Sequence, residues 1–142
     1  DYIIITSSFM IDKYKFALKT QMDKEDGFEP TKQMASLAEQ GLELRKEFGR
    51  GGTEVGVARA RNIKNRDSLS ADTVKRMHSF FSRHRSDLAA PSAKRGHEDY
   101  PSAGVIAWML WGGDPANPDG AGAGWAERHA EQLDTEEKDN SK

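Results

Sequence analysis

One short segment limits what this chain can fold into. Residues 105–111 read Val-Ile-Ala-Trp-Met-Leu-Trp, after a Pro-Ser pair at 101–102 and before two glycines at 112–113. A helix that is apolar on nearly all sides must be covered all round by other elements. We therefore predict a helix over residues 103–111 at the centre of the fold, capped by Ser102.

The preceding residues supply helices that could cover this centre. Apolar residues recur at helical spacing from Met34 to Phe48, and Gly49 suits a helix end, which predicts a helix over 30–48. Thr53 and Ser70 are N-cap candidates for two further helices, over 53–65 and 70–86. The partial apolar face of the 53–65 helix is expected at Val55, Ala58 and Ile63.

The later part of the chain is more polar. Residues 87–100, which include Pro91 and Gly96, are a predicted loop, and so are residues 114–124, which are rich in Gly, Ala, Pro, Asn and Asp. A short final helix is expected from Trp125, and residues 134–142 read as a disordered acidic tail. The tryptophans at 108, 111 and 125 could line a binding groove, but large apolar residues more often form the core.

The predicted fold is therefore mainly α, a small bundle of four or five short helices with an N-terminal strand or extended arm. Residues 1–29 form the arm and linker, residues 30–133 the helical domain, and residues 134–142 the acidic tail. The chain has 142 residues, which suits one domain.

The arm is the first candidate interaction site. Its β-branched run favours a strand, and no later segment offers an obvious partner strand. Unpaired strand edges tend to recruit another chain, although the arm could equally fold back on its own core. The expected partner-binding residues are Tyr2, Ile3, Ile4, Ile5 and Phe9.

Charge defines the second candidate site. The net charge is -2, yet residues 45–95 contain 13 Lys/Arg and only 5 Asp/Glu. Such a block binds nucleic acid or an acidic partner, or simply forms a solvated face. Two basic helices joined by a short turn would also fit a helix-turn-helix. The expected contact residues are Arg50, Arg59, Arg61, Lys64, Lys75 and Arg76.

No pattern in the sequence predicts catalysis. The chain has no Cys, which excludes a thiolate zinc site and a Cys nucleophile. Its four His show no ligand spacing, and His84 reads as a core histidine. The glycine turn at 49–53 could cradle an anion or simply join two helices tightly. We expect no catalytic residue, no metal and no cofactor, and no apolar run is long enough to cross a membrane.

Three strings in the sequence carry a resemblance. They span residues 48–61 (FGRGGTEVGVARAR), residues 69–84 (LSADTVKRMHSFFSRH) and residues 100–114 (YPSAGVIAWMLWGGD). Over about residues 30–130 the chain resembles a small uncharacterised domain encoded by tailed bacteriophages, with an altered loop at 86–99 and an insertion at 115–124. The resemblance implies phage origin and a virion-related role, and it carries no catalytic residue.

These features together favour a non-enzymatic structural component of a bacteriophage particle, associated with the capsid, neck or tail. Its partners would be other phage structural proteins in an oligomeric assembly, with possible DNA contact and no membrane. Its location would be the virion, and the host cytoplasm during assembly. The alternative is a nucleic-acid-binding accessory protein that uses the basic helices over 53–86.

Overall fold

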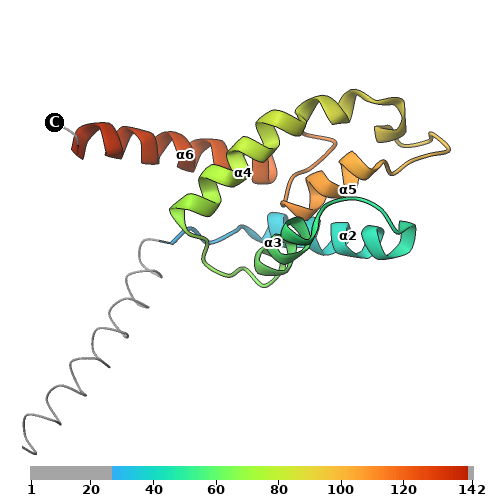
Figure 1. Cartoon of the computed structure of the whole chain (residues 1–142), viewed down its shortest axis with the longest axis horizontal. Helices are drawn as coiled ribbons and strands as arrows, with labels where there is room; N and C mark the ends of the chain where they lie inside the picture. The colour runs from blue at the N-terminus through green and yellow to red at the C-terminus, as the bar shows by residue number, and fades with distance from the viewer. Residues whose placement is uncertain (1–26, 141–142) are drawn as a thin grey trace, which may run out of the picture.

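The computed structural model describes residues 27–140 and places the side chains of residues 27–136. This part of the chain is mainly helical and contains no strand, which confirms the predicted fold class (Figure 1). The predicted strand or extended arm lies outside the described residues. The helices are α2 (Lys32–Phe48), α3 (Glu54–Lys64), α4 (Ala71–His84), α5 (Ala103–Leu110) and α6 (Ala121–Asn140), with short 3-10 turns η1 (Arg85–Ala89) and η2 (Pro91–Ala93).

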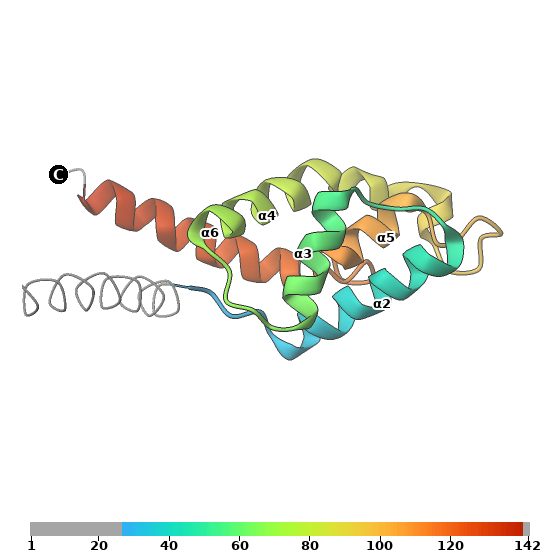
Figure 2. The same ribbon diagram turned by 60° about the horizontal axis from the view of Figure 1, so that its bottom comes forward.

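Helix α5 is the centre of the bundle, as its sequence predicts. It packs on α2, α3 and α4, while α2 pairs with α3 on one side and α4 pairs with α6 on the other (Figure 2). Val105, Ile106 and Leu110 are fully inaccessible to solvent, and Trp108 is 1% exposed. The cap predicted at Ser102 is also present, because its side chain accepts a hydrogen bond from the Val105 N–H.

The starts of the other helices follow local sequence signals. Thr31, Thr53 and Ser70 each accept a hydrogen bond from the N–H three residues later, so the predicted caps at Thr53 and Ser70 are confirmed. Gly49 ends α2 in the left-handed conformation, with φ of 65°. Helix α2 begins at Lys32, two residues after the predicted start.

Two glycines allow the helices to approach α5 closely. A Cβ built on Gly41 of α2 would lie 2.8 Å from the Leu110 nitrogen, so a larger residue would push the helices apart. Gly51, in the turn between α2 and α3, has φ of 98°, and a Cβ there would lie 2.5 Å from the Ile106 Cβ. The glycine turn therefore packs on α5.

The predicted apolar face of α3 is wrong in part. Val55 is 58% exposed and Ala58 is exposed, and only Ile63 of the expected face is buried. Tertiary packing explains the difference. Because α3 packs on both α2 and α5, it buries a different set of mostly small residues. The buried residues are Gly56, Val57, Ala60 and Ile63.

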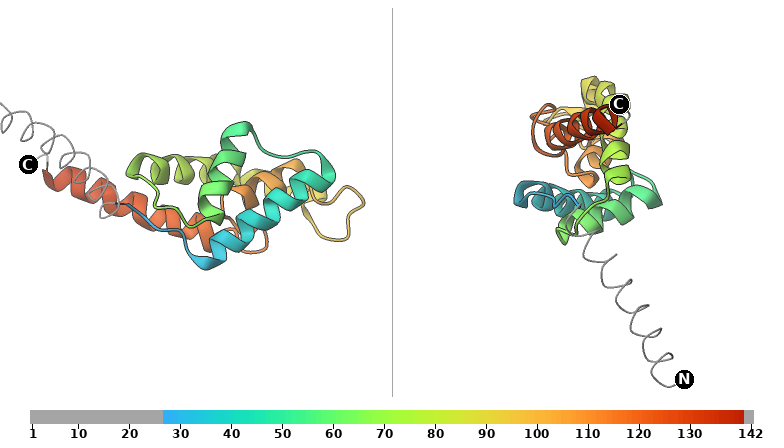
Figure 3. Two further views of the ribbon diagram at one scale, coloured as in Figure 1. Left: turned by 90° about the horizontal axis from the view of Figure 1, so that it is seen from below. Right: turned by 90° about the vertical axis from the view of Figure 1, so that its left-hand side faces the viewer.

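The predicted loops and tail are also corrected. Helix α4 ends at His84, two residues before the predicted end, and two 3-10 turns, η1 and η2, follow over residues 85–89 and 91–93, in the first part of the expected loop. Helix α6 starts at Ala121 because the Gly122 N–H donates to the Gly112 carbonyl at 2.9 Å, which anchors this end against the core. It then continues to Asn140, so residues 134–140 are helical rather than disordered. The end of α6 projects beyond the bundle (Figure 3).

The described part starts with a short attachment to the bundle. Phe28 and Leu69 exchange two backbone hydrogen bonds of 2.8 Å, and the Arg66 guanidinium donates to the Pro30 carbonyl at 2.9 Å. The carboxylate of Glu29 lies 3.5 Å from Arg66. These contacts hold residues 28–30 against the α3–α4 turn, so the packed body includes the last two residues of the predicted linker.

Candidate functional site

A groove runs along one side of α2, between this helix and the segments that precede and follow α5. Its volume is about 590 Å³, which is within the usual range for ligand sites. The residues that line it come from α2, from η1 to the start of α5, from α5 and from the loop after α5. They are Leu37, Gln40, Glu43, Leu44, Glu47, Leu88, Ala93, Lys94, Arg95, Tyr100, Met109, Asp114, Pro115, Ala116 and Pro118.

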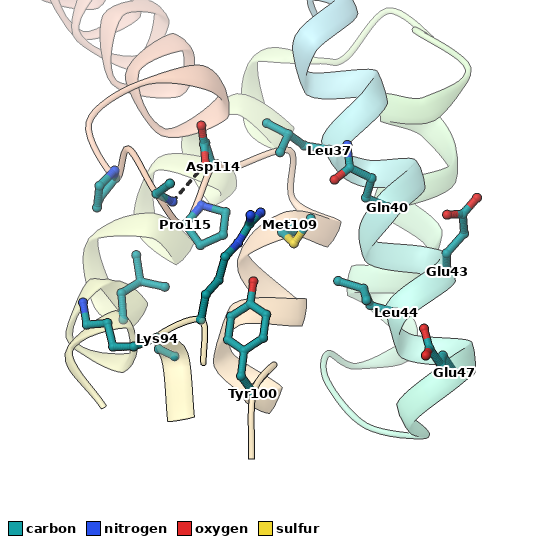
Figure 4. Close-up of a pocket in the computed structure, with 15 residues that line it drawn as sticks. Leu37, Gln40, Glu43, Leu44, Glu47, Lys94, Tyr100, Met109, Asp114 and Pro115 are labelled. Carbon is teal, nitrogen blue, oxygen red and sulfur yellow. Dashed lines mark hydrogen bonds between the residues drawn. The ribbon is translucent and has the colours of Figure 1, made fainter. Parts of the chain in front are cut away.

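The interior of the groove is apolar. Leu37 and Leu44 point into it from α2, and Tyr100, Met109 and Pro115 lie across from them (Figure 4). All of these except the buried Met109 are only half-buried. The bundle therefore leaves a row of apolar side chains incompletely covered along the groove.

The two rims of the groove carry opposite charges. Glu43 and Glu47, the acidic rim, lie along the outer edge of α2, and Lys94 lies on the opposite side (Figure 4). Arg95 also lines the groove and follows Lys94 in the chain, and these two residues are the basic rim. All four side chains are exposed, and within the described part of the chain none has a hydrogen bond or ion pair. Charged groups of both signs are thus available to a ligand.

The basic side of the groove is held by contacts to the backbone. The Arg50 guanidinium donates to the carbonyls of Asp99 and Pro101, at 3.1 and 3.0 Å. The Ser102 N–H donates to the Ser92 carbonyl at 3.1 Å, which closes the 92–102 segment. Asp114 accepts a hydrogen bond from the Ala116 N–H at 2.9 Å and so orders the loop after α5.

The tryptophans considered as a groove in the sequence are core residues instead. Phe80 stacks on Trp111 with ring centroids 4.8 Å apart, and Phe81 meets Trp108 edge-on at 4.8 Å. Trp125 is 4% exposed. Sequence reasoning missed the real groove. The available signal was the width of the apolar stripe on α2. Leu37 and Leu44 extend this stripe beyond Met34, Ala38 and Gly41, the three residues that the helix buries.

The basic residues predicted as contacts do not form one free surface. Arg50 is engaged with the 99–101 backbone, and Lys64 lies 3.9 Å from the Glu39 carboxylate. Lys75 also makes an interaction within the chain. Helices α3 and α4 make no extensive contact with each other, so they do not form a packed helix-turn-helix pair.

Arg59 and Arg76 differ from the other basic residues. The Arg59 Nε is buried, and no hydrogen-bond partner reaches it among the described residues. Burial, and then the positive charge of Arg76, lower the pKa of the Arg59 guanidinium below its usual value. Two neighbouring positive charges attract anions. Arg61 is exposed beside this pair in the sequence, and no ion pair engages it in the described part.

The remaining candidates have structural roles. The glycine turn is a tight connection packed on α5, with its Gly51 carbonyl accepting from the Arg45 guanidinium at 2.9 Å. His84 is half-buried rather than a core residue, and its Nδ1 lies 3.0 Å from the Asp87 carboxylate. The expected partner-binding residues of the arm, Tyr2, Ile3, Ile4, Ile5 and Phe9, lie outside the described residues.

His129 is the histidine whose surroundings perturb it. Its ring packs between Phe28 and Trp125, with centroid distances of 4.8 and 4.9 Å. Burial, and then the nearby Arg128, lower the pKa of the imidazole, although a hydrogen bond with Gln132 acts in the opposite direction. The neutral ring therefore fits this position better than the charged one.

Comparison with known proteins gives no relative. No protein-family model, no curated protein and no solved structure matches this chain. Within residues 27–136, no three His, Asp or Glu side chains gather in a way that could hold a metal ion. No helix in the described part combines the length and apolarity needed to cross a membrane.

Proposed function

We propose that this protein is a non-enzymatic structural component of a bacteriophage particle, associated with the capsid, neck or tail. It binds neighbouring subunits through its N-terminal arm and its helical module. The observation that carries this proposal is the groove beside α2, with an apolar interior and two oppositely charged rims that pair with no residue in the part of the chain that the structure describes. The phage context rests on the resemblance of the three sequence strings.

The chemistry of the groove favours binding over catalysis. None of the residues that line it is a His, Ser or Thr. Its Asp114 carboxylate already caps the loop that contains Ala116. A triad-type hydrolytic site needs a Ser, Thr or Cys nucleophile beside a His base, and none of these residues lines the groove. Half-buried leucines beside charged rims instead suit an amphipathic protein segment.

The direct test is association with particles. Particles are purified from the source phage by density gradient, treated with a lysine-reactive crosslinker, and analysed by mass spectrometry. We expect the chain in the particle fraction, with crosslinks from Lys13 or from Lys94 to a shell, neck or tail protein. A chain that stays entirely in the unassembled fraction contradicts the proposal.

A second candidate function rests on the Arg59–Arg76 pair. Among the described residues neither guanidinium forms an ion pair, and two positive charges close enough to perturb each other favour contact with the phosphates of a nucleic acid. Phosphate contacts make affinity fall steeply with salt. The purified chain is titrated with duplex DNA at low and moderate salt, with Arg59→Ala and Arg61→Ala as variants and Lys64→Ala as control. A steep salt slope that the two arginine variants reduce supports this function.

A further inference from the structure

Among the described residues, no side chain partners the four rim charges or covers the apolar interior of the groove, so its natural occupant should supply complementary groups. That occupant needs apolar side chains for Leu37, Leu44 and Tyr100, cations for the acidic rim, and an anion for the basic rim. The chain itself contains such a segment before the described residues. Residues 12–19 read Asp-Lys-Tyr-Lys-Phe-Ala-Leu-Lys.

We propose that the groove binds residues 12–19 of a second copy of this chain. This inference rests on the proposed assembly function and names the segment and the surface that perform it. Tyr14, Phe16 and Leu18 would cover the apolar interior. In an extended peptide these three side chains share one face. Lys13 and Lys15 would lie on the opposite face at the mouth of the groove, from where their long side chains would reach the acidic rim. Asp12, just before them, would supply the anion for the basic rim.

The size of the groove agrees with this occupant. Along α2 the lining extends from Leu37 to Glu47, which is about 15 Å at the helical rise of 1.5 Å per residue. An extended peptide advances about 3.3 Å per residue, so about five residues fit along this length. Residues 14–18, which contain the three large apolar side chains, have this length.

The position of the groove favours a second copy over the same chain. The described part begins beside the α3–α4 turn, where Phe28 is tied to Leu69, near the start of α2 (Figure 2). The α2 residues that line the groove run from Leu37 to Glu47, next to the other end of the helix. Lys19 and Gly27 are eight positions apart, which allows at most about 29 Å of fully extended chain. The same chain would have to turn back before Gly27 and reach the groove within this length, whereas a second copy has no such constraint.

Charge reversal tests the pairing in the full-length chain. Sedimentation equilibrium measures self-association of the double variant Glu43→Lys/Glu47→Lys, which we expect to be about tenfold weaker than for the unaltered chain. Adding Lys13→Glu and Lys15→Glu to the same chain should restore most of the lost affinity. The matched control is Glu131→Lys/Asp134→Lys, the same charge change on exposed positions of α6, which should leave association unchanged.

Crosslinking then identifies the occupant and its copy. A photoreactive benzophenone side chain replaces Phe16, and isotopically heavy and light copies are mixed before irradiation. We expect crosslinks to Leu44, Tyr100 or Met109 that join a heavy to a light chain. Crosslinks confined to chains of one isotope, or directed outside the groove, overturn this inference.

The two proposals fail in different ways. If copies associate but charge reversal has no effect and the crosslinks lie elsewhere, the groove assignment is wrong and the assembly function stands. If the chain is monomeric at all concentrations and absent from particles, the assembly function itself is wrong.

Discussion

The two sides of α5 show opposite ways of covering an apolar helix. Toward α4, large aromatic rings close the contact, with Phe80 on Trp111 and Phe81 on Trp108. Toward α2, the contact depends on Gly41, and the leucines beside it stay half-buried along the groove. On the α4 side, these four aromatic side chains are buried by the bundle alone. The α2 side holds the backbones together but leaves side chains available to a partner.

This comparison predicts that the aromatic side dominates stability. Replacing Trp108, which is 1% exposed, by Ala should reduce the free energy of unfolding by about 3–5 kcal/mol, because it leaves a large cavity. Denaturant unfolding followed by circular dichroism measures the loss. Phe48→Ala is the control, since Phe48 is 39% exposed and should cost less. Equal losses for the two variants would contradict the comparison.

The second prediction concerns the close approach of α2 to α5. Gly41→Ala should reduce the free energy of unfolding by about 1–3 kcal/mol, because the added Cβ would clash with the α5 backbone near Leu110. This loss should appear although Ala is the better helix former. The control Gln33→Ala, at an exposed position of the same helix, should be neutral or slightly stabilising. A stabilised Gly41→Ala variant would show that the helices can separate at little cost.

The third prediction separates binding from stability in the groove. Leu44→Asp should weaken self-association about tenfold while lowering the free energy of unfolding by only about 1 kcal/mol, because Leu44 is half-buried. Sedimentation equilibrium and denaturant unfolding measure the two effects. Val55→Asp makes the same change at an exposed apolar residue outside the groove, and it should leave association intact. If the two variants self-associate with equal affinity, the groove has no role in binding.

The smallest expected effect is a pH dependence at the junction of α6 with residues 27–30. Burial lowers the pKa of His129 in the folded state, so the folded chain binds fewer protons than the unfolded chain just below the ordinary histidine pKa. Stability should therefore be full above about pH 6.5 and decline as the pH falls through and below that value. Thermal unfolding between pH 5 and 8 measures the decline.

The control for this prediction is the variant His129→Phe, which keeps the ring contacts with Phe28 and Trp125. It should show a shallower decline toward low pH than the unaltered chain. An unchanged pH profile would assign the effect to other groups.

The sequence predicts most of the helical framework because the determinants are local. Ser70 and Ser102 identify two helix starts through their capping hydrogen bonds, and the apolar run at 105–111 identifies the buried centre. The inward face of α3 could not be predicted, since its packing on α2 and α5 overrides its own weak pattern. The start of α6 depends on the backbone contact between Gly122 and Gly112, which no local signal reveals.

The groove could not be predicted from the sequence for a related reason. Its two rims come from residues about fifty positions apart, such as Glu43 and Lys94, and only the packed bundle brings them to one site. The basic block over 45–95 was visible in the sequence. Its internal use by Arg50 and Lys64 was not, because these contacts join distant segments.

Hydrogen exchange tests the central claim, that the groove is a docking surface, most directly. Amide exchange of the full chain is followed by mass spectrometry at a high concentration, where copies associate, and at a low one. We predict slower amide exchange at high concentration in peptides that cover residues 37–47 and 92–101, and an unchanged exchange rate in α3. Association without any change in those two segments would contradict it.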